Sequence, residues 1–439
     1  MCDFYNPGGF NFSLLDLRRS YYLALNFSLN LIDIYKPDTI FLTNTPHSLQ
    51  SIVFTRVCEK EGINIFFKRE ITIPGNFYFQ SSIFSKVFPS YKKKKKTNVS
   101  EENFLLLNDY YNIVKNNDQK FIKNLFIKKR NRYLIESKLI KFNFLYLSFY
   151  FFFLRQLTLS IFFLLAKFLK NFIYYNIGHK KYENPTISLE DFFKKKTEKL
   201  QTSSQNLLEY DLLLLKGDLR KFKLLQKYNS LVCAKSESDK YIYFPLHYQP
   251  EATTYPFGNY FIDQLNAIKL VSSSLPKNYF LYVKEHPDTF NIGRDGWVRG
   301  DYSRDIHFYN EIINLKNVKI VSMNFSSLDL VKRSSGLATI NGAVGLEYVI
   351  NKKPVIFFGN SWLDSCPGVY RCENIDDCNN IMKKIVNLDY KIEESQIFNF
   401  FEKWSVNLYN LNNYSEEKKN YVSNLFLNCL KLKNYRQEK

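Results

Sequence analysis

Hydrophobic and polar positions follow a regular rhythm in residues 241–358, where short apolar runs of strand length alternate with stretches of helical spacing. The predicted strands are Tyr241–Leu246, Tyr279–Val283, Val318–Val321, Leu337–Ile340 and Pro354–Phe358. The predicted helices between them are Tyr260–Ser273, Ser303–Leu315, Ser327–Ser334 and Ala343–Asn351. Strands that alternate with helices pair in parallel, so this region predicts a parallel sheet with helices on both faces.

The first 80 residues show a shorter version of the same rhythm. Helical spacing at Leu14–Ile34 and Ser48–Lys60 alternates with strand-like runs at Thr39–Thr43 and Ile63–Lys68, and Gly62 stands where a helix C-cap is expected. This order again implies parallel pairing. Because the chain opens on Asn, Pro and Gly instead of a strand, this domain is predicted to be shortened or divergent.

The middle of the chain departs from this rhythm. Residues 90–140 carry no clear pattern, and Lys92–Lys96 is typical of either a solvated loop or an anchor for anionic lipid. Phe144–Leu154 is almost wholly apolar, but Arg155 and Gln156 interrupt it well short of the roughly 20 residues that a spanning helix needs. An interfacial helix at a membrane and a helical hairpin buried in the protein both fit this segment.

These changes in pattern predict an α/β protein in four parts. Residues 1–140 form a Rossmann-like domain, and residues 141–205 form an inserted aromatic helical segment with a linker. Residues 206–390 form a second Rossmann-like domain. Residues 391–439 close the chain as helices, with helical spacing that begins at Gln396 and continues to Leu432.

The formal net charge of +19 favours a polyanionic partner. No zinc finger, basic zipper or RNA-binding signature accompanies it, so we expect no nucleic acid and favour an anionic membrane surface or a phosphorylated substrate. Seven scattered cysteines suit a reducing compartment, and their spacing fits no zinc site. Without a basic, apolar leader at its start, the protein is predicted to be cytoplasmic.

Three polar loops that follow predicted strands carry the candidate chemistry of residues 241–359. In the last of them, Gly342 and Gly345 open a helix after the strand that ends at Ile340. Glycine there allows backbone amides to approach an anion, and Glu347 could accept hydrogen bonds from ribose hydroxyls. The alternative is that both glycines serve packing alone.

The second loop, Lys284-Glu-His-Pro287, places a cation and an imidazole on one face at the end of a strand. Such a pair suits a phosphate or the sugar beside it, and Pro287 fixes the turn that holds His286. A loop histidine is more often structural, which is the alternative here. Arg294 and Arg299 follow in a glycine-rich stretch, where either could meet a phosphate.

Acid–base candidates come from both halves of the chain. The first loop of the C-terminal half offers His247 and Glu251, and its prolines stiffen it. In the N-terminal half, His47 and Glu70 each follow a predicted strand, and either could act as general base on an acceptor hydroxyl. A solvated loop residue is the alternative for His47 and for Glu70, and an ordinary proline-rich turn is the alternative for the first loop.

Several familiar signatures are absent from the sequence. There is no Asp-x-Asp pair for a metal–diphosphate clamp, no Walker loop, no Gly-x-Ser-x-Gly and no His-Glu-x-x-His. These absences argue against an NTPase, a serine hydrolase and a zincin. They fit a metal-independent transferase that neutralises its leaving group with protein cations and a helix dipole.

The three loops together resemble the capsular polysaccharide biosynthesis proteins, a group that includes bacterial Kdo transferases of capsule export. The likeness covers roughly residues 240–390, and its motifs are Phe244–Thr254, Tyr282–Pro287 and Thr339–Glu347, followed by Lys353–Gly359. One departure is Ala343, where the resemblance leads us to expect Ser or Thr.

The resemblance implies a GT-B fold, with two Rossmann-like domains that face each other across a cleft, and a nucleotide sugar held by the second domain. The residues expected to bind this donor are Lys284, His286, Pro287, Arg294, Thr339, Asn341, Gly342, Gly345 and Glu347. We expect a CMP- or UDP-linked donor, no metal cofactor, and a polysaccharide or glycolipid acceptor at the inner face of the cytoplasmic membrane. A nucleotide-sugar epimerase and a non-catalytic member of a capsule synthesis or export complex are the alternatives.

Overall fold

A computed structural model describes most of the predicted α/β regions. The described residues are 14–73, 76–81, 98–116, 220–221, 223–233, 236, 238–249, 251, 253–290 and 304–410. One compact unit consists of Met1–Asn131, Lys223–Phe290 and Arg299–Lys439, and a second consists of Arg132–Phe222 and Asn291–Val298. Predictions for the lysine run, the aromatic segment, Arg294 and Arg299 lie outside the described residues. No helix within the described ranges is long and apolar enough to cross a membrane.

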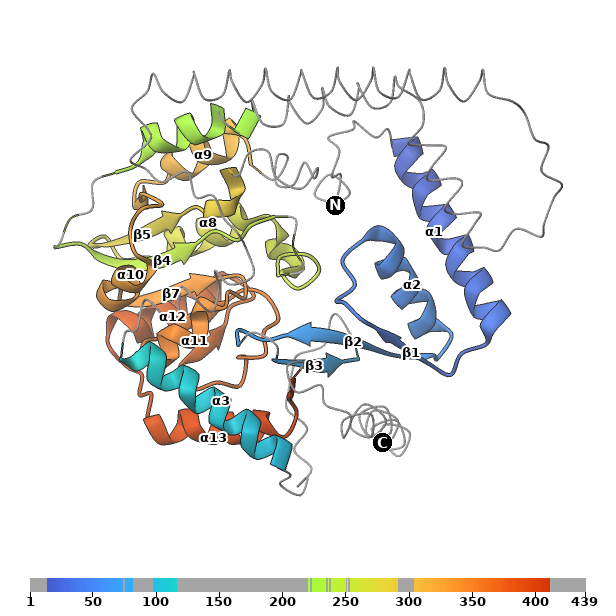
Figure 1. Ribbon diagram of the computed structural model, residues 1–439. Helices are drawn as coiled ribbons and strands as arrows, with labels where there is room; N and C mark the ends of the chain where they lie inside the picture. The colour runs from blue at the N-terminus through green and yellow to red at the C-terminus, as the bar shows by residue number, and fades with distance from the viewer. Residues whose placement is uncertain are drawn as a thin grey trace, which may run out of the picture. The chain divides into compact units, whose positions relative to one another are not determined.

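A wholly parallel six-stranded sheet forms the centre of the first unit (Figure 1). Its strands, in spatial order, are β6 (Val318–Ile320), β5 (Tyr279–Lys284), β4 (Lys240–Pro245), β7 (Gly336–Thr339), β8 (Val355–Phe357) and β9 (Val369–Arg371). The five strands predicted from the apolar runs are therefore confirmed, as is the α/β class. Strand β9 was not predicted, because only three partly exposed residues form it.

Both faces of this sheet are buried, which follows from the alternation of side chains along each strand. On β4, Tyr241 and Tyr243 belong to one apolar cluster, and Ile242 and Phe244 belong to the other. Burial on both faces explains why the predicted strands read as continuous apolar runs instead of alternating with polar residues.

Helices cover each face. The cluster that contains Ile242 also takes residues from α8 (Gln264–Ser274), α9 (Ile306–Ile313) and α12 (Ile375–Val386). The cluster that contains Tyr241 takes residues from α10 (Ser327–Arg333), α11 (Val344–Ile350), α13 (Glu394–Ser405) and α3 (Asn98–Lys115). The helix predicted from Gln396 ends at Ser405, and the short strand β10 (Tyr409–Asn410) follows it. The predicted continuation of that helix from residue 411 lies outside the described residues.

A smaller mixed sheet is formed by β1 (Thr39–Leu42), β2 (Asn64–Glu70), β3 (Asn76–Gln80) and β10, in that order. Strands β1 and β2 pair in parallel as predicted, whereas β3 pairs antiparallel with β2 and with β10. Helices α1 (Leu14–Tyr35) and α2 (Leu49–Lys60) pack on each other beside it. A capping box of Ser48 and Ser51 starts α2, and Gly62 follows its end with φ +70°.

Helix α3 lies in the region that the sequence pattern left unassigned. It packs against α13 and α11, and its Asn103 Nδ2 donates hydrogen bonds to the carbonyls of Ser405 and Leu408 at 3.0 and 2.8 Å. An early segment of the chain therefore completes the core on one face of the larger sheet. The four-part division of the chain stays a prediction.

Candidate functional site

The strand order of the larger sheet reverses between β4 and β7. From β4 the chain winds outward through β5 and β6, and then returns to β7 and winds the other way through β8 and β9. In parallel sheets, ligands bind outside the carboxyl ends of the strands at such a switch point. Here His247 follows β4 and Thr339 ends β7, and His247 Nε2 lies 2.9 Å from Thr339 Oγ1.

Burial governs the chemistry of His247. Burial, together with the smaller effects of the nearby positive charges of His286 and Arg304, lowers the pKa of the imidazole from 6.5 to about 3. The ring is consequently neutral near pH 7. The loop around it is held by Gln264, whose side chain accepts from the His247 amide at 2.7 Å and donates to the His247 carbonyl at 3.0 Å.

Gly342 makes this arrangement possible. A Cβ atom at that position would lie 2.9 Å from Thr339 Oγ1 and 3.4 Å from His247 Cε1. Gly345 has a different neighbour, because its Cβ would lie 2.6 Å from Phe357 Cζ on β8. The first glycine therefore borders the polar pair, and the second allows α11 to pack closely on the sheet.

The loop after β5 brings Lys284 and His286 to the same end of the sheet, as expected. Lys284 Nζ donates to the Phe325 carbonyl at 2.5 Å and to Ser327 Oγ at 3.2 Å, and burial lowers its pKa to about 8. The His286 amide donates to Glu285 Oε1 at 2.7 Å, and its ring centroid lies 5.9 Å from that of Tyr248. Pro287 starts the short helix η4 (Pro287–Phe290).

A buried ion pair that was not predicted holds these loops together. Glu285 accepts from Arg304 Nε and from the Tyr309 hydroxyl, both at 2.8 Å. Arg304 also donates to Gln249 Oε1 at 2.8 Å and to the His247 carbonyl at 3.0 Å. Arg304 therefore links the loop after β4 to the loop after β5. The only hint of this ion pair in the sequence was a charged residue, Glu285, between Lys284 and His286. Nothing in the sequence identified Arg304 as its partner.

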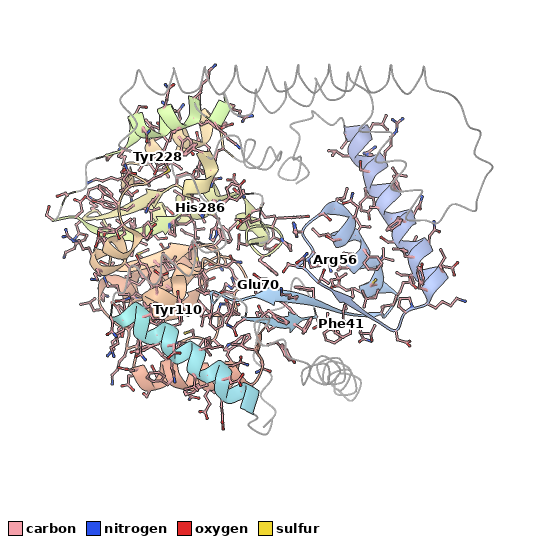
Figure 2. All side chains as sticks on the ribbon, viewed as in Figure 1. Phe41, Arg56, Glu70, Tyr110, Tyr228 and His286 are labelled. Carbon is pink, nitrogen blue, oxygen red and sulfur yellow. The ribbon has the colours of Figure 1, made fainter. Side chains whose placement is uncertain are left out.

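A cavity of about 440 Å³ brings residues of the smaller sheet and of the switch region together. Its lining residues are Thr43, Asn44, Thr45, His47, Lys68, Arg69, Glu70, Ile71, Thr72, Thr253, Phe257, Asn341, Ala343, Ser361 and Trp362. Of the predicted site residues, His47, Glu70 and Asn341 line it. Figure 2 labels Glu70 at the end of β2 and His286 in the loop after β5.

The two candidate bases in this cavity differ in their surroundings. The Nδ1 atom of His47 lies 2.7 Å from the Thr45 carbonyl. Because a carbonyl can only accept, Nδ1 carries the proton of the neutral ring, and Nε2 is its accepting nitrogen. Glu70 instead pairs with Lys68 Nζ at 2.9 Å. The imidazole is therefore the better placed of the two to take a proton.

Arg69 and Asn341 organise the wall of the cavity. Arg69 is buried, and it donates to the Asn360 carbonyl at 2.5 Å and to Gln80 Oε1 at 3.0 Å. Asn341 Nδ2 donates to the same Asn360 carbonyl at 3.1 Å. Arg69 was not predicted as a site residue, because in the sequence it is one of three adjacent charged residues, Lys68, Arg69 and Glu70.

Other predicted site residues lie apart from the lining of this cavity. Glu347 is within α11, where burial raises its pKa from 4.5 to about 7. Glu251 lies in the first loop, and its carbonyl accepts from the Thr254 amide at 3.0 Å. No group of three or more His, Cys, Asp or Glu suited to a metal ion occurs among the residues that the structure describes.

Residues 256–390 match the family described as capsule polysaccharide biosynthesis protein, which confirms the resemblance of the motifs over that region. No curated protein matches the sequence. Among solved structures, the beta Kdo 2,7 transferase KpsC of Thermosulfurimonas dismutans is 12% identical and has a TM-score of 0.34, with 91% of this chain and 90% of that chain covered.

A UDP-GlcNAc 2-epimerase from Methanocaldococcus jannaschii is 10% identical and has a TM-score of 0.30, with 88% of this chain and 80% of that chain covered. A UDP-GlcNAc 2-epimerase from Neisseria meningitidis, bound to UDP-GlcNAc, is also 10% identical. Its TM-score is 0.27, with 95% of this chain and 82% of that chain covered. These values describe a distant likeness.

Proposed function

We propose that this protein is a glycosyltransferase that moves a sugar from a nucleotide-sugar donor to a capsular or other surface polysaccharide, or to its lipid-linked precursor. The match of residues 256–390 to the capsule polysaccharide biosynthesis family supports this class of reaction. The observation that carries the proposal is the cavity, where His47 and Glu70 meet Asn341 of the glycine-containing loop. In this proposal the two sheets belong to the two domains of a GT-B enzyme.

The donor phosphate is assigned to the loops at the switch point. His286 and the third ammonium proton of Lys284 are assigned to hold it. The positive end of the α11 dipole adds to the attraction for an anion, although the Gly345 and Leu346 amides already donate to the Gly342 and Ala343 carbonyls at 3.0 and 3.2 Å. His247 is buried and neutral, so its role is to hold Thr339 and the Gly342 turn. No metal is needed in this scheme, because protein groups neutralise the leaving group.

His47 is assigned as the base that removes a proton from the acceptor hydroxyl. The Thr45 carbonyl sets its tautomer and directs the accepting Nε2 to that task. The acceptor and the partner surfaces follow from the proposal: a polysaccharide or glycolipid at the inner face of an anionic membrane, with other capsule synthesis or export proteins nearby. The net charge of +19 supports this placement.

Calorimetric titration with CMP, UDP and their sugar conjugates tests the donor site. One of these nucleotides is expected to bind, and His286→Ala is expected to weaken it by about tenfold, as for the loss of one charge-assisted hydrogen bond. His307→Ala is the matched control, because the His307 side chain is 80% exposed on α9. Absence of nucleotide binding, or binding that His286→Ala leaves intact, would contradict the proposal.

Product analysis separates the three functional classes. With a glycan acceptor present, a transferase releases nucleotide and lengthens the acceptor. An epimerase converts free UDP-sugar without any acceptor. A binding protein does neither and still takes up nucleotide or glycan.

A further inference from the structure

Two buried oxygen atoms at the cavity wall, Asn341 Oδ1 and Thr253 Oγ1, have no hydrogen-bond partner among the residues that the structure describes. Asn341 as a whole is only 9% exposed. Buried polar atoms without partners cost stability, so their persistence indicates that a ligand or water completes their hydrogen bonds. Both residues line the same cavity, so one ligand there could contact both of them.

The orientation of the Asn341 amide is fixed by its other contact. Nδ2 donates to the Asn360 carbonyl at 3.1 Å, and that carbonyl also accepts from Arg69 Nη2 at 2.5 Å. A reversed amide would set Oδ1 against a carbonyl oxygen, which repels it because both atoms only accept. Oδ1 is therefore an acceptor without a donor, and a group that completes its hydrogen bonding must donate to it.

The cations of this cavity are already engaged within the protein. Lys68 Nζ pairs with Glu70 Oε1 at 2.9 Å. Arg69 donates to Gln80 and Asn360, and its guanidinium lies 3.7 Å from the centroid of the Phe257 ring. A phosphate or carboxylate, which only accepts hydrogen bonds, would face the accepting Oδ1 of Asn341 and the charge of Glu70. The cavity consequently disfavours an anion.

The remaining lining suits a group that is apolar on its faces and hydroxylated on its edges. Phe257 and Trp362, both largely buried, provide aromatic side chains in the lining of the same cavity. Ligand sites commonly combine such surface with a few placed polar groups. A hydroxyl can donate to Asn341 Oδ1 and can exchange hydrogen bonds with Thr253 Oγ1 in either direction.

We propose that Asn341 and Thr253 bind the hydroxyl groups of a neutral sugar ring within this cavity. The inference deepens the proposed function and rests on it, because the sugar is either the one carried by the donor or the terminal residue of the acceptor. Both sources share the same chemistry at these two oxygens.

A set of methyl glycosides of hexoses and N-acetylhexosamines, without nucleotide, is the probe, read by saturation-transfer NMR and calorimetry. At least one glycoside binds the wild-type protein. Thr253→Val keeps the shape of the side chain and removes only Oγ1, so it weakens that glycoside by about tenfold without lowering the unfolding temperature. Asn341→Leu weakens it further.

Thr254→Val is the matched control. Thr254 is buried next to Thr253, and its Oγ1 donates to the Glu251 carbonyl at 3.1 Å. This variant loses a hydrogen bond within the protein, so its unfolding temperature falls while its glycoside affinity does not change. The proposal is overturned if no glycoside binds, if Thr253→Val leaves the affinity unchanged, or if inorganic phosphate binds in a way that depends on Thr253.

Comparison of UDP and CMP with their sugar conjugates identifies the source of the sugar. If the donor sugar occupies the cavity, Thr253→Val weakens the conjugate and leaves the bare nucleotide unchanged. If the acceptor occupies it, the variant weakens free glycosides alone. Failure of nucleotide binding with glycoside binding intact would remove the proposed transferase and keep the sugar site, so the two failures can be told apart.

Discussion

At the residue scale, the candidate site depends on a few side chains whose surroundings set their protonation and their reach. His247 is buried and neutral, whereas His47 lies at an exposed position with its tautomer set by the Thr45 carbonyl. The two imidazoles therefore have different surroundings. His247 contacts Thr339 within the buried loop, and His47 lines the cavity.

The first prediction concerns His47. Replacement His47→Ala is expected to lower the turnover of sugar transfer by about 10²- to 10⁴-fold, with little change in donor affinity, because general base catalysis contributes on that order. Steady-state kinetics with donor and acceptor varied separately measures both. The fully folded His307→Ala variant serves again as the surface control. Unchanged turnover in His47→Ala would reassign the base.

The second prediction concerns Glu347. Burial raises the pKa of its carboxyl group from 4.5 to about 7. Between these pH values the folded state holds a proton that the unfolded state releases, so the contribution of Glu347 to stability falls as pH rises. The variant Glu347→Gln removes this loss. It is expected to unfold with a free energy equal to that of the wild type below pH 4.5 and higher by about 3 kcal/mol above pH 7.

Urea unfolding of both proteins at several pH values from 4 to about 8 measures this difference. The curves of free energy against pH should separate progressively as pH rises. Parallel curves would show that Glu347 titrates normally.

At the scale of elements, Arg304 joins the loops after β4 and β5 because it donates hydrogen bonds to both. Its guanidinium reaches Glu285 on one loop and the His247 carbonyl on the other. The side chains of Arg304 and Glu285 are 1% and 0% exposed. A buried pair of this kind gives little net stability when intact, but removal of one partner leaves the other charge stranded.

The third prediction follows from that asymmetry. Glu285→Gln is expected to reduce the free energy of unfolding by about 3–5 kcal/mol, because Arg304 loses its compensating charge. Chemical denaturation measures the change. Glu311→Gln is the matched control: it breaks the exposed Lys269–Glu311 pair, of 2.7 Å, and should leave stability nearly unchanged. Equal effects of the two variants on stability would contradict the role of the buried Glu285–Arg304 ion pair in holding the two loops together.

At the scale of the described compact unit, segments distant in sequence complete each other. Strand β10 near residue 410 pairs with β3, and α13 packs on α3. Trp404 of α13 is 1% exposed, and its ring centroid lies 5.1 Å from that of Tyr78 and 5.6 Å from that of Trp362. This aromatic cluster joins β3 to α13 and to the segment between β8 and β9.

The fourth prediction tests that junction. Trp404→Ala is expected to cost about 3–5 kcal/mol of stability, as for other deletions of large buried aromatic side chains. It should lower the unfolding midpoint of the aromatic fluorescence and of the helical circular dichroism together. Tyr260→Ala is the control, because Tyr260 is 83% exposed. A midpoint of Trp404→Ala equal to that of Tyr260→Ala would contradict the role of the cluster.

Five of the six strands of the larger sheet, β4 to β8, could be predicted from local patterns in the sequence. Strands buried on both faces read as apolar runs, and the glycine-containing turn after β7 was visible for the same kind of reason. The candidate groups were also visible, because His47, Glu70 and Asn341 each follow a predicted strand. Strands β3, β9 and β10 and helix α3 were missed, because their short or irregular patterns gain meaning only from the partners they pack against.

Which of these groups lie close together could not be known before the fold. His247 and Thr339 lie 92 positions apart in the sequence, and Arg304 reaches Gln249 and His247 over 55 and 57 positions. The burial that keeps the His247 imidazole neutral also results from the fold. The cavity joins residues near position 45 to residues near 341. Local sequence patterns carry no information on such contacts. The contacts form only when the two sheets and their loops pack together. For that reason the sequence could indicate the candidate residues, whereas their contacts with one another depend on the fold.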